Sequence, residues 1–323
     1  MELKLRTGKP VLQLASGSLG LDCGHGDFSF VSHAHHDHSG FCRKAKKIIA
    51  SSATLELMRA RGAFTAFETA EPQDVHVELL PSGHVLGGSQ LFAEEGGRSF
   101  LYTGDFKLSG GAATPRVNEL LMECTYGSRK YRFPPTRQVA AEIASWVKET
   151  LDCRSIPVIG AYSLGKAQVV VGILNEAGVV PIVNNETAGV CEVYCRHGVD
   201  LQYATVGGDA CREGEPFAAV VPANLVGPRL VEVVSRSYGL PVKTAVATGW
   251  SAAGAFAGVD KSFPLSDHED FDGLVEFVKK TSPEKVFCTH GSSAEFAGEL
   301  RQLGFNAIAL ESGNAVQKVL EVD

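Results

Sequence analysis

The chain has 323 residues, 44% of them hydrophobic and 21% charged, which is the composition of a globular protein with one large domain or two smaller ones. Its formal net charge of −7 argues against a protein that coats nucleic acid nonspecifically. It does not exclude a nucleic-acid substrate, because bound divalent metals would reverse the field locally. No apolar run approaches the roughly 20 residues of a membrane-spanning helix. The N-terminus does not resemble a signal peptide, so we expect a cytoplasmic protein with no membrane partner.

The first 125 residues alternate short apolar runs with Gly-rich turns. Runs of four to six residues that are rich in Val, Leu and Phe and bounded by Gly or Ser predict strands. Between them, residues 53–62 (ATLELMRARG) predict a short helix that ends at Gly62. This part of the chain is therefore predicted to be rich in β-structure.

The pattern changes at about Thr136. Residues 135–152 have helical spacing, and strand-then-helix units follow, such as SIPVIGAYS into LGKAQVVVGILNEAG. Strands that alternate with helices predict a parallel α/β sheet. The last part of the chain predicts a helix at 270–282, a strand at 285–291, a further helix and a closing strand.

The hexapeptide HAHHDH at 33–38 is the most informative motif. On a strand or loop, His33 and His35 project to one side and can bind one metal. Asp37 and His38, beyond the turn, can face a second metal. Imidazole and carboxylate together suit zinc, manganese or iron rather than calcium. A His-rich surface turn is the alternative, but the strand-like segment FSFVS before the motif argues against it.

Three further candidate ligands follow in separate turns: His84 in PSGHVLGG, Asp105 in LYTGDFK and His290 in VFCTHGS. Each comes just after an apolar run and beside a Gly, where a side chain can be placed at the end of a strand. Any one of them alone would more often be an ordinary turn residue.

This series of motifs resembles the metallo-β-lactamase superfamily: HxHxDH, then a lone His, a lone Asp and a distal His. The resemblance implies that two divalent metals, zinc in preference to manganese, activate a hydroxide. It assigns His33, His35 and His84 to one metal, Asp37, His38 and His290 to the other, and Asp105 to a bridge between them. It also implies that Asp22, in GLDCG, supports the ligands from behind, and that His36 does not bind metal.

Within the superfamily, the chain resembles the β-CASP nucleases. Asp105 and His290 are separated by 185 residues, which leaves room for the inserted cap of that family. LMECTYG carries Glu123 at the position of its acidic motif A, PLSDHEDF carries His268 at motif B, and CTHG carries His290 at motif C. AYSLGKAQ resembles the turn that begins the cap.

The β-CASP resemblance implies an α/β fold: an αββα sandwich core over 1–125 and 256–323, with an α/β cap over 126–255. It also implies that Asp37, His268 and Glu123 are catalytic. His268 would contact the scissile phosphate or protonate the leaving group, and Glu123 would hold its ring. Taken alone, the segment around His268 favours a different interpretation, in which Ser266 or Asp267 caps a helix and the histidine is incidental.

The segment GAYSLGKA fits the phosphate-loop pattern G-x-x-x-x-G-K. Ala167 stands where a Ser or Thr would bind magnesium, so we do not expect an ATPase. The same geometry can still bind an anion, and we expect Ser163, Gly165 and Lys166 to hold a substrate phosphate.

These observations predict a metal-dependent phosphodiesterase that acts on nucleic acid. The phrase ATGWSAAGAF resembles the small ligase-associated DNA exonucleases, whereas a His at motif C is typical of the RNA-processing branch. We expect a DNA exonuclease, with an RNA-processing nuclease as the alternative. A catalytically silent scaffold subunit is disfavoured because every ligand position is filled. A small-molecule hydrolase such as a thioesterase is disfavoured by the long insertion. The sequence does not identify protein partners in repair or RNA processing.

Overall fold

The computed structural model describes residues 1–41, 45, 47–62, 68–69, 75–207, 212, 214–254 and 256–310. The chain divides into two compact units. Unit 1 comprises Met1–Arg129 and His268–Asp323, and unit 2 comprises Lys130–Asp267. Residues 311–323, the end of the core range predicted from the sequence, lie outside the described residues.

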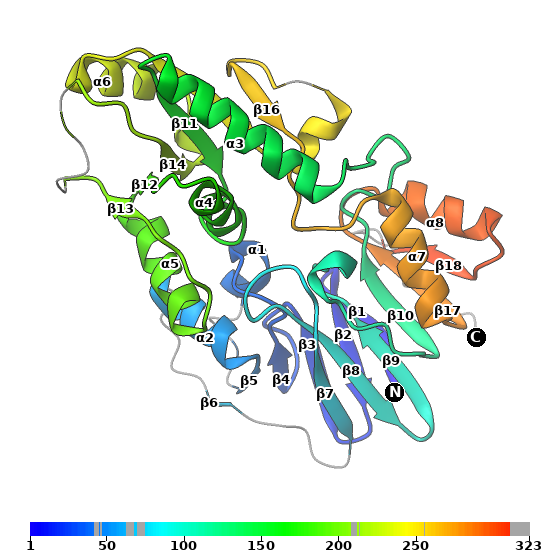
Figure 1. Cartoon of the computed structure of the whole chain (residues 1–323). Coiled ribbons are helices and arrows are strands. Elements are labelled where there is room, and N and C mark those ends of the chain that lie inside the picture. Colours follow the sequence, from blue (N-terminus) through cyan, green and yellow to red (C-terminus); the bar gives the residue numbers. More distant parts are fainter. Residues whose placement is uncertain are drawn as a thin grey trace. The chain divides into compact units, whose positions relative to one another are not determined.

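Unit 1 contains two six-stranded sheets (Figure 1). The first sheet runs in the order β1 (Glu2–Arg6), β2 (Lys9–Leu14), β3 (Gly17–Leu21), β4 (Phe28–Phe30), β5 (Lys47–Ile49) and β6 (Glu68–Thr69). The second runs in the order β18 (Ala307–Ala309), β17 (Lys285–Thr289), β10 (Glu119–Glu123), β9 (Arg98–Tyr102), β8 (Ser89–Glu95) and β7 (His76–Pro81). The helices of unit 1 are α1 (His36–Ser39), α2 (Ser52–Ala60), η2 (Leu108–Gly110), α7 (Phe271–Thr281) and α8 (Ser293–Gln302).

The two sheets share one apolar core. Leu12 and Phe30 of the first sheet pack with Tyr102, Leu121 and Phe287 of the second. Because side chains alternate along a strand, the second sheet presents another set of residues to its opposite face. There, α7 and α8 cover the sheet and form a second core with residues such as Met122, Phe277 and Phe296. Sheets packed face to face with helices outside give the αββα sandwich that the sequence predicted.

Unit 2 is built on one six-stranded sheet in which every strand pair is parallel. Its order is β13 (Ala204–Thr205), β12 (Ile182–Val183), β14 (Ala219–Pro222), β11 (Ile156–Ala161), β15 (Val242–Ala247) and β16 (Lys261–Phe263). The connecting helices are α3 (Thr136–Asp152), α4 (Lys166–Glu176), α5 (Asn185–Arg196), η3 (Ala223–Leu225), α6 (Pro228–Tyr238) and η4 (Gly249–Ala253). The strand-then-helix alternation in the sequence therefore predicted this sheet correctly.

The periodic segments matched well, whereas the shortest elements were missed. The helix predicted at 135–152 is α3, and that predicted at 270–282 is α7. The two-residue strand β13 gave no recognisable pattern. β16 pairs with β15 and so belongs to the sheet of unit 2, although the sequence-based boundary at 255 assigned its residues to the core. None of the described helices is both long and apolar enough to span a membrane.

The packing between the two sheets of unit 1 predicts how core and surface truncations affect stability. Leu121 is fully buried between the sheets, whereas Leu303, just after α8, is 48% exposed. We expect Leu121→Ala to lower the free energy of unfolding by about 2–5 kcal/mol, because it leaves a cavity in a packed core. The matched Leu303→Ala change should stay within about 0.5 kcal/mol. Urea unfolding of both variants tests this, and equal losses would contradict the packing described here.

Candidate metal centre

The candidate ligands sit at the ends of strands. His33 and His35 follow β4, Asp105 follows β9, and His290 follows β17. Strand β10 ends at Glu123. Strands β9, β10 and β17 are adjacent and parallel, so their carboxyl ends meet at one edge of the second sheet. Residues far apart in sequence are thereby delivered to the same place.

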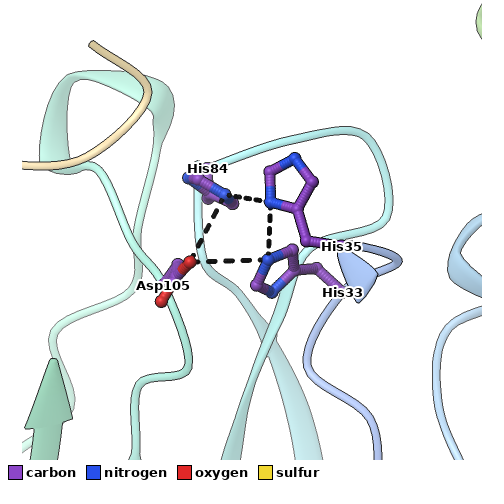
Figure 2. A group of neighbouring side chains, drawn as sticks. All are labelled: His33, His35, His84 and Asp105. Carbon is purple, nitrogen blue, oxygen red and sulfur yellow. Dashed lines mark hydrogen bonds and ion pairs between the residues drawn. The ribbon is translucent and has the colours of Figure 1, made fainter. Parts of the chain in front are cut away.

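Four of the predicted ligands form a compact cluster: His33, His35, His84 and Asp105 (Figure 2). Their nearest donor atoms all lie within 4.8 Å of one another. His33 Nε2 lies 2.9 Å from His35 Nδ1, and His84 Nε2 lies 3.3 Å from the same atom. The ring nitrogens converge on a common point, as ligands of one metal do.

Asp105 lies at the centre of a larger constellation. Its Oδ2 atom is 3.4 Å from Nε2 of both His33 and His38, and 3.7 Å from Nε2 of His84. The same oxygen is 3.8 Å from Nε2 of His268. Asp105, Glu123 and His268 form a second group with the spacing of metal ligands. Asp105 is thus common to both groups.

Asp37 and His290 lie on the more open side. Both side chains are exposed, whereas His38 is buried. Asp37 Oδ2 is 3.6 Å from His38 Nε2, and the rings of His38 and His290 are 5.6 Å apart between centroids. The three residues that the resemblance assigned to a second metal are therefore neighbours, linked through His38.

Asp22 contacts the cluster through His38. Its carboxylate lies 2.7 Å from His38 Nδ1 and accepts hydrogen bonds from the Ser32 hydroxyl and the Tyr102 hydroxyl at 2.6 and 2.8 Å. The backbone N–H of Ser32 also donates to it at 2.7 Å. Asp22 itself has φ of 48°, an uncommon conformation for a residue other than glycine. These hydrogen bonds therefore fix the Asp22 carboxylate beside Nδ1 of His38.

The electrostatics of the cluster favour positive charge at its centre. Burial lowers the pKa of His38, but Asp105 and Asp22 outweigh it and raise the pKa to about 10. Burial and the neighbouring histidines lower the pKa of His33 well below its usual value, so this ring keeps a lone pair available. A neutral imidazole such as His33, next to carboxylates that attract a cation, belongs to the donor set of a zinc or manganese site.

His268 is held by Glu123. Its Nδ1 lies 2.9 Å from Glu123 Oε1, although the two residues are 145 positions apart in the sequence. Burial raises the pKa of Glu123, but the charge and hydrogen bond of His268 outweigh it and the net shift is downward. The Glu123 carboxylate is therefore favoured in its ionised form beside the His268 ring.

The predicted phosphate-binding turn lies in unit 2, between β11 and α4. Gly165 has φ of 86°, and its N–H donates to Gln168 Oε1 at 2.8 Å. The N–H of Ala167 donates to the carbonyl of Tyr162. The Lys166 side chain is buried, and its Nζ lies 3.6 Å from Asp267 Oδ2. Ser163 is half-buried.

Three contacting residues were missed from the sequence. Ser32 and Tyr102 fix Asp22, and Asp267 pairs with Lys166. Ser32 adjoins the hexapeptide, and that adjacency was the one local sign that it belongs to the site. Nothing in the sequence near Tyr102 marks its partner, which lies 80 positions away.

Comparison with known proteins places the chain among metallo-hydrolases. Residues 261–310 match the "Zn-dependent metallo-hydrolase RNA specificity domain". Over 312 residues the chain is 36% identical to a "Probable DNA ligase" of Opitutus terrae, a match that covers 90% of this chain and 29% of that protein. It is 25% identical to "DNA cross-link repair protein SNM1" of Arabidopsis thaliana over 80% of this chain and 60% of that protein. An "RNase J-like protein" of Methanocaldococcus jannaschii is 26% identical over 46% of this chain and 43% of that protein.

The chain spans less than two thirds of the length of each of these relatives. Its fold matches a crystal structure of a protein of unknown function from Enterococcus faecalis V583, with a TM-score of 0.62 and 13% identity, over 89% of this chain and 80% of that one. The domain match and the names of these relatives agree with the metal-ligand motifs that supply His33, His35, His84 and Asp105. The chain is thus similar to Zn-dependent metallo-hydrolases, in agreement with the resemblance of its motifs to the β-CASP nucleases of the metallo-β-lactamase superfamily.

Proposed function

We propose that this protein is a metal-dependent nuclease that hydrolyses phosphodiester bonds, and that its physiological activity is that of a DNA exonuclease. The observation that carries the proposal is the convergence of four imidazoles on one Asp105 oxygen, at the edge where the parallel strands end. A scaffold protein of the same fold would have no need to maintain this set of converging imidazole and carboxylate groups.

Two metal ions, zinc in preference to manganese, would be held by the cluster, with His33, His35 and His84 on one and Asp37, His38 and His290 on the other. Asp105 would be shared by both. Bound there, the metals would supply an activated water and neutralise charge on the phosphoryl oxygens. The exposed position of Asp37 and His290 leaves that side accessible to a substrate.

His268 and Glu123 would contribute the proton chemistry. With Nδ1 held against Glu123, the ring is fixed and Nε2 points toward Asp105. A proton on Nε2 can pass to the leaving oxygen, while the Glu123 carboxylate stabilises the imidazolium before the transfer. We assign His268 as the general acid and Glu123 as the residue that orients it.

The extent of the matches favours DNA as the substrate. Two relatives that align over 80% or more of this chain are named for DNA ligation and DNA cross-link repair. The match to the RNase J-like protein covers 46% of the chain. An RNA-processing nuclease is the second candidate, and the RNA-specificity name of the matched domain over 261–310 favours it.

Ser163 and Lys166 remain our proposed phosphate anchor. Because the N–H groups of Gly165 and Ala167 already donate within the chain, such an anchor depends on the Ser163 hydroxyl and the Lys166 ammonium. Lys166 would then divide its charge between the phosphate and Asp267.

A substrate panel tests the proposed function. We expect purified protein loaded with zinc or manganese to shorten end-labelled DNA progressively, and to do so faster than RNA of the same sequence. Single- and double-stranded forms of each are compared on sequencing gels. Faster cleavage of RNA would support the second candidate, and no cleavage of any strand by metal-loaded protein would contradict both.

The role of His268 can be separated from metal binding. We expect His268→Ala to keep its metal content and to lose hydrolysis by about 10²–10⁴-fold, the usual contribution of a general acid. His35→Ala should lose metal, and the exposed His76, on β7, provides a control whose replacement by Ala changes neither property. Metal analysis and rate measurements together distinguish a general acid from a metal ligand. If His268→Ala lost as much metal as His35→Ala, His268 would be a metal ligand.

Asp22 should act on metal affinity without touching the metal. Asp22→Asn weakens the partner of His38 Nδ1, and we expect zinc affinity to fall by about 10–100-fold, as for other residues that support metal ligands. The matched control is Asp27→Asn, because Asp27 is an exposed carboxylate that accepts from Ser18 on the same sheet. Competition with a chromogenic chelator measures the zinc affinity of both variants. Equal affinities would show that Asp22 does not support the metal ligands.

A further inference from the structure

Large apolar side chains gather at one edge of the unit 2 sheet. Tyr162 follows β11 and is 55% exposed, and Leu225 in η3, which follows β14, is 49% exposed. Trp250, in η4 directly after β15, is 39% exposed. Exposed apolar residues that cluster, rather than scatter, mark an interaction surface.

The strand register places these loops side by side. In the sheet, β11 lies between β14 and β15 and runs parallel to both, with Ala161 opposite Pro222 and Gly160 opposite Val246. All three loops therefore leave the same carboxyl edge, which can be followed at the ends of β11 and β14 in Figure 1. A Cβ on Gly160 would lie 2.7 Å from Val226 Cγ2, so the loop after β14 folds closely onto β11. In parallel α/β sheets, this edge is where ligands usually bind.

The charges at this edge suit an anionic ligand. The segments 162–165, 223–227 and 248–259 contain no Asp or Glu. Lys166 Nζ lies 4.9 Å from the Tyr162 ring centroid, although it also faces Asp267 at 3.6 Å. Lys130 Nζ lies 5.0 Å from the ring of Tyr131, which packs edge-on against Trp250 at 5.4 Å. Each of the two aromatic sites is thus associated with a lysine.

We propose that this edge binds a single-stranded segment of nucleic acid, with bases stacked on Tyr162 and Trp250. Exposed aromatic rings beside lysines are the combination with which proteins hold single strands, because every base offers a π-face and every nucleotide a phosphate. A protein partner would also cover apolar side chains, but it would not require acid-free loops. The inference rests on the proposed nuclease function and names residues outside its metal centre.

Tryptophan fluorescence provides a direct test. The chain has two tryptophans, and replacing Trp146, which packs on Phe263, by Phe leaves Trp250 as the single reporter. The ligands are 12-nucleotide oligo(dT) and oligo(U) with phosphorothioate linkages, which slow hydrolysis, and an abasic strand of the same length. We expect both oligonucleotides to quench Trp250 in the metal-loaded protein and the abasic strand to leave it unchanged.

Affinity measurements complete the test. We expect Trp250→Ala and Tyr162→Ala each to weaken oligonucleotide binding by about 5- to 160-fold, the range for loss of one stacked base. Trp250→Phe should retain most of the affinity, and Val233→Ala, an exposed apolar truncation on α6, should retain all of it. Neither Ala variant should alter metal content or the hydrolysis of bis-nitrophenyl phosphate, which has no base to stack.

The possible failures are distinct. Unchanged affinity in both Ala variants of a protein that still binds and cleaves nucleic acid would overturn the stacking surface alone. An equal loss on the abasic strand would also overturn it, because the rings would then act without bases. A parent protein that neither binds nor cleaves any strand would overturn both the surface and the proposed function.

Discussion

The site depends on the position of a single carboxylate. Asp105 is the one group that lies within 3.8 Å of His33, His38, His84 and His268 alike, among the contacts of the described residues. Its place is set by Gly104, which turns the chain at φ of 52° immediately before it. A Cβ on Gly104 would lie 2.4 Å from Ser32 Cβ, so a larger residue would push the end of β9 away from Ser32 and the hexapeptide that follows it. Because Ser32 also donates to Asp22, one close backbone approach fixes both carboxylates that flank His38.

How much the sequence predicts depends on how local each feature is. The hexapeptide and the long helices follow from spacing over a few residues, and they were predicted because period and composition are local properties. The link between Glu123 and His268 spans 145 positions, and only the family resemblance connected them. The ion pair of Lys166 with Asp267 and the Tyr102–Asp22 hydrogen bond arise from tertiary packing. No periodicity marks such contacts, and so they became visible only in the folded chain.

The net charge of the chain is a poor guide to its substrate because the charge is unevenly divided. Unit 2 has 12 Lys and Arg against 13 Asp and Glu, so most of the excess of −7 belongs to unit 1. Carboxylates at a metal centre are matched by the cations they bind, and they leave no net repulsion toward a phosphate once loaded. The loops at the edge of the unit 2 sheet contain no Asp or Glu, so they add no repulsion toward a phosphate. A moderately acidic protein can therefore act on a polyanion when the negative charge is confined to a site that binds metal.

The metal centre and the aromatic edge would both recognise what all nucleotides share. The metal centre would act on the phosphodiester and the rings would contact the π-face of a base, so neither would read the hydrogen-bonding edges that distinguish one base from another. In a duplex the bases are already stacked on one another, and the rings cannot reach them without unstacking. A protein built in this way would discriminate by strandedness rather than by base sequence. The same reasoning would account for relatives that are named for DNA repair and for RNase activity, since the 2′-hydroxyl, which separates the two polymers, would be contacted by neither feature.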